Sequence, residues 1–438
     1  RGINQAATST TTNVYNNKVT SNTHLGTGVW SGIYIAGTSS SLMLTVNLYN
    51  NEVSGNTKSG ASGIMNCVFA SSSNQTSNFY GNNIFNNTAT SSTSAVYGYY
   101  NFAVGFVENV YNNNVYNISG GTGEVVGLYV RSGSSPADKQ IYGNNVYNLT
   151  GSNIVGGLYA DYCGTGLIYR NNIYNILSNA TSLVSSAYGI QYGTSQGTNL
   201  NINNNFISDI KAPANSNANA VYGIWMTGSS STVAKIYYNS VYLNATTTAV
   251  NFGSSAILIA STPFLIDLRN NILVNNSAFA GTGRTIAVQR GTATLTNYGP
   301  LSGNNCVYAG TPGTNNLIYF DGTNLDQTIQ NFKDRVTPRE QATFTEVPPF
   351  VNVATTPYNL HIQTGIATQT EKGAQPVDVT VDYDNNTRSA TFPDVGADEF
   401  GGIMVDLASP NILYTTLTNG NATSPRVLSN FASITDPS

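Results

Sequence analysis

Short runs of alternating apolar and polar residues return along the chain about every 32 residues. The segment 141–147, Ile-Tyr-Gly-Asn-Asn-Val-Tyr, is a typical copy, and a second alternating run lies upstream after a small residue, usually glycine. A two-residue period is typical of a β-strand, and the Ser, Thr, Asn and Gly clusters between the runs favour turns. Only residues 325–336 are a candidate helix. The pattern therefore predicts an all-β repeat of three strands, joined by a polar turn, an asparagine turn and a variable loop.

One asparagine recurs at the same place in every copy of the repeat. The ten copies are Asn17, Asn51, Asn82, Asn113, Asn144, Asn171, Asn204, Asn239, Asn270 and Asn304. Repetition at this period indicates a solenoid, in which each unit buries its apolar face against its neighbours. The residue after the asparagine varies, so we expect the shared asparagine to point inward at a bend, in the left-handed backbone region. Coils stacked about 4.8 Å apart would then connect these amides in a structural hydrogen-bonded ladder.

Apolar residues form columns at fixed distances from this asparagine. Two residues after it we expect the core position, occupied by Val19, Val53, Ile84, Val115, Val146, Ile173, Phe206, Val241, Ile272 and Cys306. One residue further, an outward column contains Phe85, Tyr116, Tyr147, Tyr174, Ile207, Tyr242 and Leu273. The upstream run adds a second outward column of Tyr34, Met65, Tyr100, Tyr129, Tyr159, Gln191 and Trp225.

Outward rings at coil spacing have three interpretations. They can stack on one another and stabilise the sheet, they can present a partner surface, or they can bind sugar rings. The candidate positions for glycan or partner binding are Tyr34, Tyr100, Tyr129, Tyr159 and Trp225.

The composition excludes several classes of function. Only 9% of the 438 residues are charged and the net charge is −4, so the chain has no basic footprint for nucleic acid. Apolar residues make up 40% of the chain, which is enough for a core and argues against disorder. No apolar run approaches the roughly 18 residues that a spanning helix needs, so we expect no membrane insertion.

The residues that usually carry chemistry are scattered. Three cysteines form no metal or disulfide motif, and Cys306 is expected to be a buried, inert thiol. His24 and His361 lack recognisable partners. The repeat region has few carboxylates, expected to be isolated in loops: Glu52, Glu108, Glu124, Asp138, Asp161, Asp209 and Asp267. We therefore expect no catalytic residue, no metal and no cofactor, although a pair such as Asp138 and Asp161, one coil apart, would suit acid–base catalysis.

The C-terminal segment resembles the closing segment of many secreted bacterial β-helix proteins. Its relevant stretches are 348–352, 358–362, 382–388 and 393–399, similar to a D-x-D-G-x-x-R … P-D-I-G-A-x-E pattern, with Asn385 at the usual glycine. Together with the asparagine coils, this segment resembles right-handed parallel β-helix proteins of the pectate-lyase-like superfold. The tyrosine-rich, charge-poor repeats resemble large cell-surface proteins of Bacteroidota exported by the type IX route. The resemblance implies an extracellular location, and capping ion pairs and turns for the charged residues of 382–399.

These observations define an expected organisation. We expect about ten parallel β-helix coils in 1–310, the last coils and a C-terminal cap over the open edge in 311–402, and partial immunoglobulin-like strands or a linker in 403–438. The chain is interpreted as a processed or excised piece of something longer, because Arg1 lies within repeat-like sequence.

The leading functional hypothesis is a structural, adhesive rod or fibre segment at the cell surface, which associates with itself or with other surface proteins. Two alternatives stay open. A glycan-binding module would lose sugar binding when Tyr129, Tyr159 and Trp225 are changed to alanine. A polysaccharide lyase or hydrolase would release products from pectin-like or alginate-like polymers.

Overall fold

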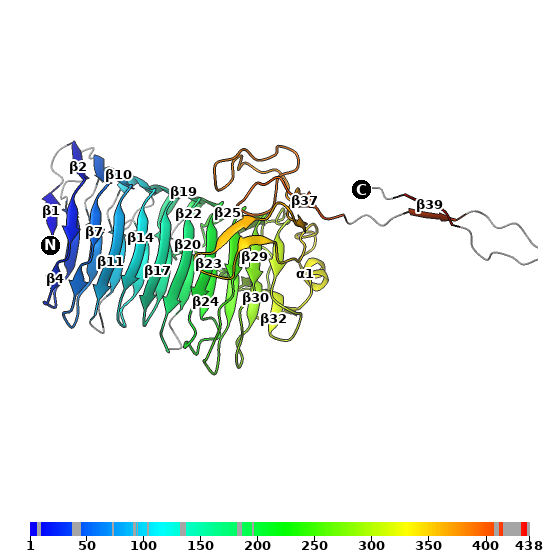
Figure 1. Cartoon of the computed structure of the whole chain (residues 1–438), viewed down its shortest axis with the longest axis horizontal. Coiled ribbons are helices and arrows are strands. Elements are labelled where there is room, and N and C mark those ends of the chain that lie inside the picture. The colour runs from blue at the N-terminus through cyan, green and yellow to red at the C-terminus, as the bar shows by residue number, and fades with distance from the viewer. Residues whose placement is uncertain are drawn as a thin grey trace, which may run out of the picture.

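The computed structural model describes residues 1–6, 10–36, 45–71, 74–90, 93, 95–102, 105–131, 137–181, 186–194, 197–406, 411–414 and 431–435. Three long sheets run along an elongated body, and each complete coil contributes one strand to each sheet (Figure 1). Successive strands within each sheet are parallel and one coil apart. The predicted parallel β-helix is therefore confirmed.

The first sheet has twelve strands, of which the last pairs antiparallel with its neighbour. They are β1 (Ile3–Ala6), β5 (Trp30–Ala36), β9 (Met65–Ala70), β12 (Val96–Asn101), β15 (Val125–Arg131), β18 (Val155–Asp161), β21 (Ala187–Tyr192), β24 (Val221–Met226), β27 (Ser254–Ile259), β30 (Thr285–Arg290), β32 (Asn316–Phe320) and β33 (Leu325–Asp326). The second sheet consists of β2 (Thr11–Tyr15), β6 (Thr45–Tyr49), β10 (Asn74–Tyr80), β13 (Gly105–Tyr111), β16 (Ala137–Tyr142), β19 (Cys163–Tyr169), β22 (Gly197–Asn203), β25 (Val233–Tyr237) and β28 (Leu265–Arg269).

The third sheet follows the asparagine corner. It consists of β3 (Lys18–Thr20), β7 (Glu52–Ser54), β11 (Asn83–Ala89), β14 (Asn114–Ser119), β17 (Asn145–Gly151), β20 (Asn172–Ser178), β23 (Phe206–Lys211), β26 (Ser240–Leu243), β29 (Ile272–Asn275) and β31 (Cys306–Tyr308), with β4 (Thr23–His24) and β8 (Thr57–Lys58) beside the first coils. The second sheet has nine described strands, so about nine coils are complete rather than the expected ten. Every coil places one apolar stripe from each sheet inside, as Val96, Val110 and Val115 do in the fourth coil.

The interior asparagine ladder is continuous from the first coil to the last. Each ladder asparagine donates from Nδ2 to the Oδ1 of the asparagine in the next coil, over 2.8–3.0 Å. The members are Asn17, Asn51, Asn82, Asn113, Asn144, Asn171, Asn205, Asn239, Asn271 and Asn305. The ladder is confirmed, and seven of its ten predicted members are correct.

Three predicted ladder positions, Asn204, Asn270 and Asn304, are wrong by one residue. They occupy the preceding corner position, where φ is +52°, +59° and +54°. The ladder asparagines themselves do not have positive φ, so the left-handed residue is the one before them, such as Asn50 (φ +53°) before Asn51. The amide that stacks inside and the residue that makes the bend are therefore neighbours rather than the same residue.

The core positions shift with the ladder in the same three repeats. Ile207, Leu273 and Val307 point into the solenoid, whereas the predicted core residues Phe206, Ile272 and Cys306 belong to a second buried cluster outside it. This outer cluster lies beneath the C-terminal segment, which packs Phe350 against Tyr242 and Tyr383 against Phe206. The outward positions of these coils are apolar because the segment covers them.

Two different parts of the C-terminal region cover the coils. Helix α1 (Ile329–Val336) lies at the end of the body and stacks Phe332 on Tyr319, with ring centroids 4.9 Å apart (Figure 1). Residues 346–402, called the cap below, fold back along the side of the later coils. The cap contains β34 (Phe350–Asn352), β35 (Asn359–Ile362) and β36 (Ala367–Thr368), and β37 (Ile403–Met404) pairs with β36.

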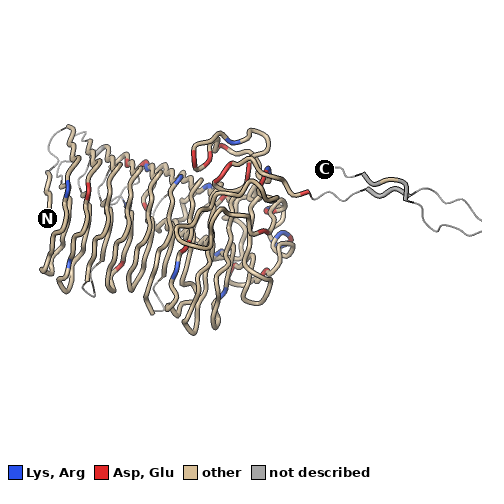
Figure 2. The backbone as a smooth tube through the Cα atoms, viewed as in Figure 1, with Lys and Arg blue, Asp and Glu red and all other residues tan. Residues whose placement is uncertain are grey.

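Charged residues are sparse along the coils and more frequent in the C-terminal region (Figure 2). In the part of the chain that the structure describes, no helix has the length and apolar character needed to cross a membrane. Beyond the cap, β38 (Asn411–Tyr414) and β39 (Phe431–Thr435) pair antiparallel, so the two predicted strands exist. The rest of the predicted immunoglobulin-like segment lies outside the described residues, and such a fold is not confirmed.

Candidate functional site

The predicted binding column follows the outer face of the first sheet. Tyr34 and Tyr100 both stack on Phe69, and Tyr129 stacks on Tyr159 with centroids 4.4 Å apart. Tyr100 meets Tyr129 edge-on, at an interplanar angle of 86°. The sequence analysis missed Phe69, which is the register partner of Tyr34, because it assigned Met65 to this column. Met65 is fully buried in the core.

Trp225 continues the same column two coils beyond Tyr159, and Gln191 separates the two aromatic residues. Its ring stacks on Tyr222 at 4.7 Å and meets Tyr188 edge-on at 6.2 Å. The five candidate residues therefore share one face, but they form two groups rather than one platform.

Two more ladders lie on the other sheets. The longest lies at the C-terminal ends of the strands of the second sheet. It contains Tyr15, Tyr49, Tyr80, Tyr111, Tyr142 and Tyr169. The other lies on the third sheet and contains Phe85, Tyr116, Tyr147 and Tyr174. Rings in both ladders are 4.8–5.1 Å apart and within 13° of parallel. The first tyrosine of the repeated motif was the available signal for the longest ladder, which the sequence analysis did not assign.

Stacking determines what these rings can bind. A ring inside a parallel ladder has a neighbour over each face, so it presents only its edge and hydroxyl to solvent. Sugar rings stack on an aromatic face, which the interior of these ladders does not offer. Burial raises the pKa of Tyr174 to about 12, so its hydroxyl stays neutral and can donate a hydrogen bond. The ladders therefore stabilise the sheets along their length and offer ring faces only where they end.

The ladder of the third sheet ends at an open groove beside the cap. Tyr174 stacks on Tyr147, but its register partner in the next coil is Ser208 instead of an aromatic residue. The groove has a volume of about 550 Å³. It is lined by Asn172, Tyr174, Phe206, Val351, Asn352, Pro357, Tyr358, Asn359, Leu360, His361 and Tyr383.

His361 connects this groove to two carboxylates of the cap. Its Nε2 lies 2.7 Å from Asp384 Oδ2, and its Nδ1 lies 2.5 Å from Asn359 Oδ1. Possible ligand atoms of His361, Asp384 and Asp398 lie within 4.8 Å of one another, which is the one group in the described residues with the composition of a metal site. The expectation that His361 has no partner is therefore wrong. The expectation of no metal site stays a prediction.

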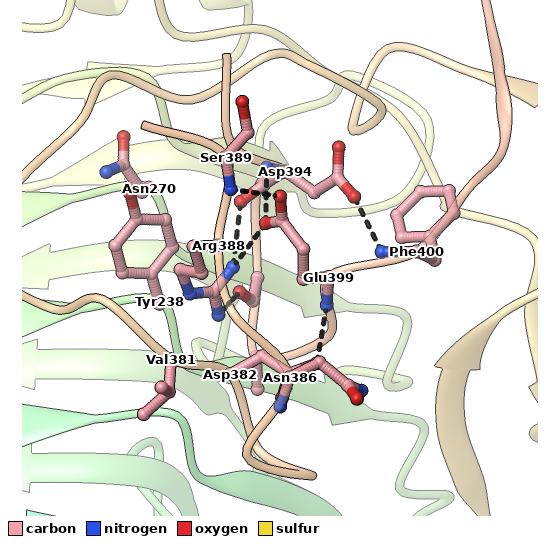
Figure 3. A network of polar contacts seen from close by, with 12 residues as sticks. Tyr238, Asn270, Val381, Asp382, Asn386, Arg388, Ser389, Asp394, Glu399 and Phe400 are labelled. Atoms are coloured by element: carbon pink, nitrogen blue, oxygen red, sulfur yellow. Dashed lines mark hydrogen bonds and ion pairs between the residues drawn. The ribbon is translucent and has the colours of Figure 1, made fainter. Parts of the chain in front are cut away.

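Arg388 anchors the cap to the coil corners (Figure 3). Its guanidinium lies 3.9 Å from the Tyr238 ring centroid, donates to Asn204 Oδ1 over 2.8 Å and pairs with Glu399 over 3.1 Å. Asn270 adds a reciprocal contact, because its amide donates to the Gln375 carbonyl and its Oδ1 accepts from the Gln375 amide. The mis-assigned corner asparagines are therefore attachment points for the cap.

The carboxylates of the closing motif hold its turns. Asp382 Oδ1 accepts from the Asn386 backbone amide over 2.7 Å. Asp394 accepts from the backbone amides of Lys372 and Phe400, each over 2.7 Å. Burial raises the pKa of Asp394 to about 7, and these two hydrogen bonds oppose the shift. Turn and ion-pair roles, as the resemblance implied, account for these contacts.

Three of the repeat-region carboxylates are held by different partners. Glu108 was expected in a loop, but it lies inside the solenoid and forms a fully buried ion pair with Lys139 of the next coil. Asp161 is buried at the end of β18 and accepts from the Tyr159 hydroxyl, whereas Asp138 is exposed on β16 and accepts from the Thr165 amide. These two carboxylates accept from different partners, and the expectation of no catalytic residue stays a prediction.

Comparison with known proteins identifies no relative: no family model matches the chain, and no match is found among the curated proteins or the solved structures.

Proposed function

We propose that this chain is a rigid, extracellular rod segment of a cell-surface protein with an adhesive role. The observation that carries the proposal is the unbroken interior ladder from Asn17 to Asn305. A solenoid has no hinge where every coil is hydrogen-bonded to the next through its strands and its interior amides. Nine complete coils at about 4.8 Å make a body about 43 Å long.

The surface of the rod suits an exposed structural role. Its polarity comes from neutral amides and hydroxyls, because only 9% of the residues are charged. Attraction between such a surface and its surroundings depends weakly on salt, since few charges are available for screening. Membership of the pectate-lyase-like superfold is part of this proposal and rests on the asparagine coils and the closing segment. Kinship with the cell-surface proteins of Bacteroidota is also part of it and rests on the tyrosine-rich, charge-poor repeats.

Electron microscopy of the native material, combined with surface labelling of the cells that produce it, tests the proposal. We expect straight rods of constant width, alone or joined end to end as filaments, and labelling of intact cells by an antibody against the chain. Beads coated with the chain should adhere to those cells. Bent particles of variable shape, or labelling only after the cells are permeabilised, would contradict the rod and its location respectively.

A further inference from the structure

We propose that the groove between Tyr174 and the cap binds a segment of a neutral polysaccharide. The proposal adds a ligand to the rod described above and does not depend on it. It concerns the third sheet, and therefore a different face from the aromatic column that the sequence analysis selected.

The first argument is the free ring face at the end of the ladder. Tyr147 covers one face of Tyr174, with ring centroids 4.8 Å apart and planes 2° from parallel. The other face is directed toward the next coil, where Ser208 takes the place of an aromatic residue. The C–H face of a pyranose ring packs on such an aromatic surface, as other flat ligands do on exposed rings.

The second argument is the aromatic wall that the next coil and the cap add beside Tyr174. Phe206 fills the corner of the next coil, and its ring lies 4.2 Å from the Tyr383 ring of the cap. Asn172, Asn359 and His361 contribute polar groups to the same lining. A pyranose has apolar faces and a rim of hydroxyls, so a lining of aromatic surface with nearby amides matches both parts of it.

Charge and shape define the class of saccharide. Among the described residues that line the groove, none is Lys, Arg, Asp or Glu, and His361 is already paired with Asp384. A uronate polymer would find no Lys or Arg among the lining residues to offset its carboxylates, so a neutral sugar fits better. The groove holds about 550 Å³ and opens to solvent, which suits a short internal stretch of a polymer rather than an enclosed small molecule.

The test measures binding of defined sugars to the full chain. Cellohexaose, xylohexaose and mannohexaose serve as neutral probes and polygalacturonate as the anionic comparator, each titrated by isothermal calorimetry. We expect at least one neutral hexasaccharide to bind and polygalacturonate not to bind. Preference for the anionic polymer, or no binding of any neutral probe at millimolar concentration, would overturn the proposal.

Matched variants locate the site. Tyr174→Ala should weaken binding about tenfold or more, because it removes the free ring face. Tyr116→Ala removes a ring of the same ladder whose neighbours are Phe85 and Tyr147, and it should leave binding within about twofold. Equal losses in the two variants would show that the sugar does not use the end of the ladder.

A second pair of variants guards against misfolding at Tyr174. Asn172→Ala should weaken binding, whereas Asn145→Ala, at the register-equivalent position one coil earlier, should not. Thermal unfolding of all four variants separates a lost contact from a lost fold. Retention of full affinity by Asn172→Ala and by a folded Tyr174→Ala would place the sugar elsewhere.

Discussion

An interior asparagine within the ladder bonds to buried polar groups of the coils on both sides of it. Asn144 donates to Asn171 Oδ1 and to the Val110 carbonyl, each over 2.9 Å. Its Oδ1 accepts from the side chain and the backbone amide of Asn113, over 2.9 and 3.1 Å. A carboxamide meets these demands because it carries a donor and an acceptor on one planar group. Aspartate would lack the donor and would bury a charge.

Removing one rung should therefore cost more than one ordinary hydrogen bond. We expect Asn144→Ala to lower the free energy of unfolding by about 2–4 kcal/mol, since it removes the shared acceptor of the side-chain and backbone amides of Asn113 and the side-chain donor to the Val110 carbonyl in a dry interior. Asn145→Ala changes the next side chain, which is partly exposed and bonded to Asn114, and should cost less than about 1 kcal/mol. Urea denaturation followed by circular dichroism compares the two. Similar costs would mean that the interior amides add little to stability.

Asp394 makes the stability of the cap depend on pH. Its pKa is raised to about 7 in the folded chain by burial, against about 3.9 in an unfolded one. The folded state therefore binds more protons than the unfolded state between these two values, and stability falls as pH rises from about 4 to about 7. Above pH 7 both states are ionised and this contribution no longer changes.

Limited proteolysis of the cap between pH 4 and pH 8, with a protease active over that range, measures this dependence. We expect cleavage within residues 373–400 to become faster as the pH rises to about 7 and then to level off. Burial also raises the pKa of the nearby Asp398, so the two carboxyl groups act in the same direction. A cap that becomes more resistant with rising pH would refute the assignment.

At the scale of whole elements, the sequence predicts the coils better than their contacts. The two-residue alternation and the repeated asparagine are local signals, so the strands, the parallel stacking and the first six rungs can be predicted from sequence. The register fails at Asn204, Asn270 and Asn304 for a long-range reason. The cap buries the outward residues Phe206, Ile272 and Cys306, so both sides of the strand are apolar there and alternation no longer identifies the inside. No local pattern shows that these strands are covered by a later segment, which begins 40 residues after Cys306 and includes Tyr383, the partner of Phe206.

In the candidate site, too, local features can be predicted from the sequence and long-range contacts cannot. The outward ring columns can be predicted from sequence, because each ring recurs at a fixed distance from the ladder. Their stacking, and the end of one ladder at Tyr174, depend on which residue the next coil supplies at the register position. The groove additionally needs the position of the cap, so its lining residues His361 and Tyr383 could not be assigned from sequence.

Paired strands also explain how two charges are tolerated inside the solenoid. Glu108 on β13 and Lys139 on β16 are register partners, and both side chains are fully buried. Removal of one partner leaves an unpaired buried charge, so we expect Lys139→Met to lower the free energy of unfolding by about 3–5 kcal/mol. The double variant with Glu108→Leu should recover most of that loss, because it removes both charges together.

The exposed pair of Lys18 and Glu52 is the matched control for the buried one. These side chains also come from register partners, with Lys18 74% exposed and a separation of 3.1 Å. Lys18→Met should cost less than about 1 kcal/mol, since solvent screens the remaining carboxylate. Chemical denaturation of the variants compares the two pairs. Failure of the double variant to recover stability would show that the buried pair stabilises the solenoid through more than the attraction between its two charges.

The whole molecule combines two cores that face opposite sides of one sheet. The inner core fills the solenoid, and the outer cluster lies between the third sheet and the cap. Contacts of the inner core connect each coil to the next, whereas contacts of the outer cluster connect coils to a segment distant in sequence. A solenoid is stabilised mainly by interactions between neighbouring coils, so the cap can detach without unfolding the inner core.

Three free cysteines can distinguish detachment of the cap from unfolding of the inner core. Cys67 and Cys163 are buried in the inner core, and Cys306 is buried in the outer cluster, where its Sγ lies 3.4 Å from the Glu346 carbonyl. Burial raises the pKa of all three thiols, to about 12 for Cys163, so none reacts readily in the folded chain. In graded urea, we expect Cys306 to be modified first and the other two together at higher urea. Pulse labelling with a thiol reagent, followed by mass spectrometry of peptides, measures the order.

Arg388→Ala should further separate detachment of the cap from unfolding of the inner core. This change removes the cation–π contact with Tyr238 and the hydrogen bond to Asn204, which hold the cap to the coils, and the ion pair with Glu399 inside the cap. We expect labelling of Cys306 to become at least tenfold faster, while Cys67 and Cys163 keep their original rates, because the inner core makes none of these contacts. Arg170→Ala is the control, since the hydrogen bond of Arg170 to the cap, to Asn385, is exposed. If all three thiols react faster together in Arg388→Ala, the cap and the solenoid unfold as one unit and the independence of the two cores is refuted.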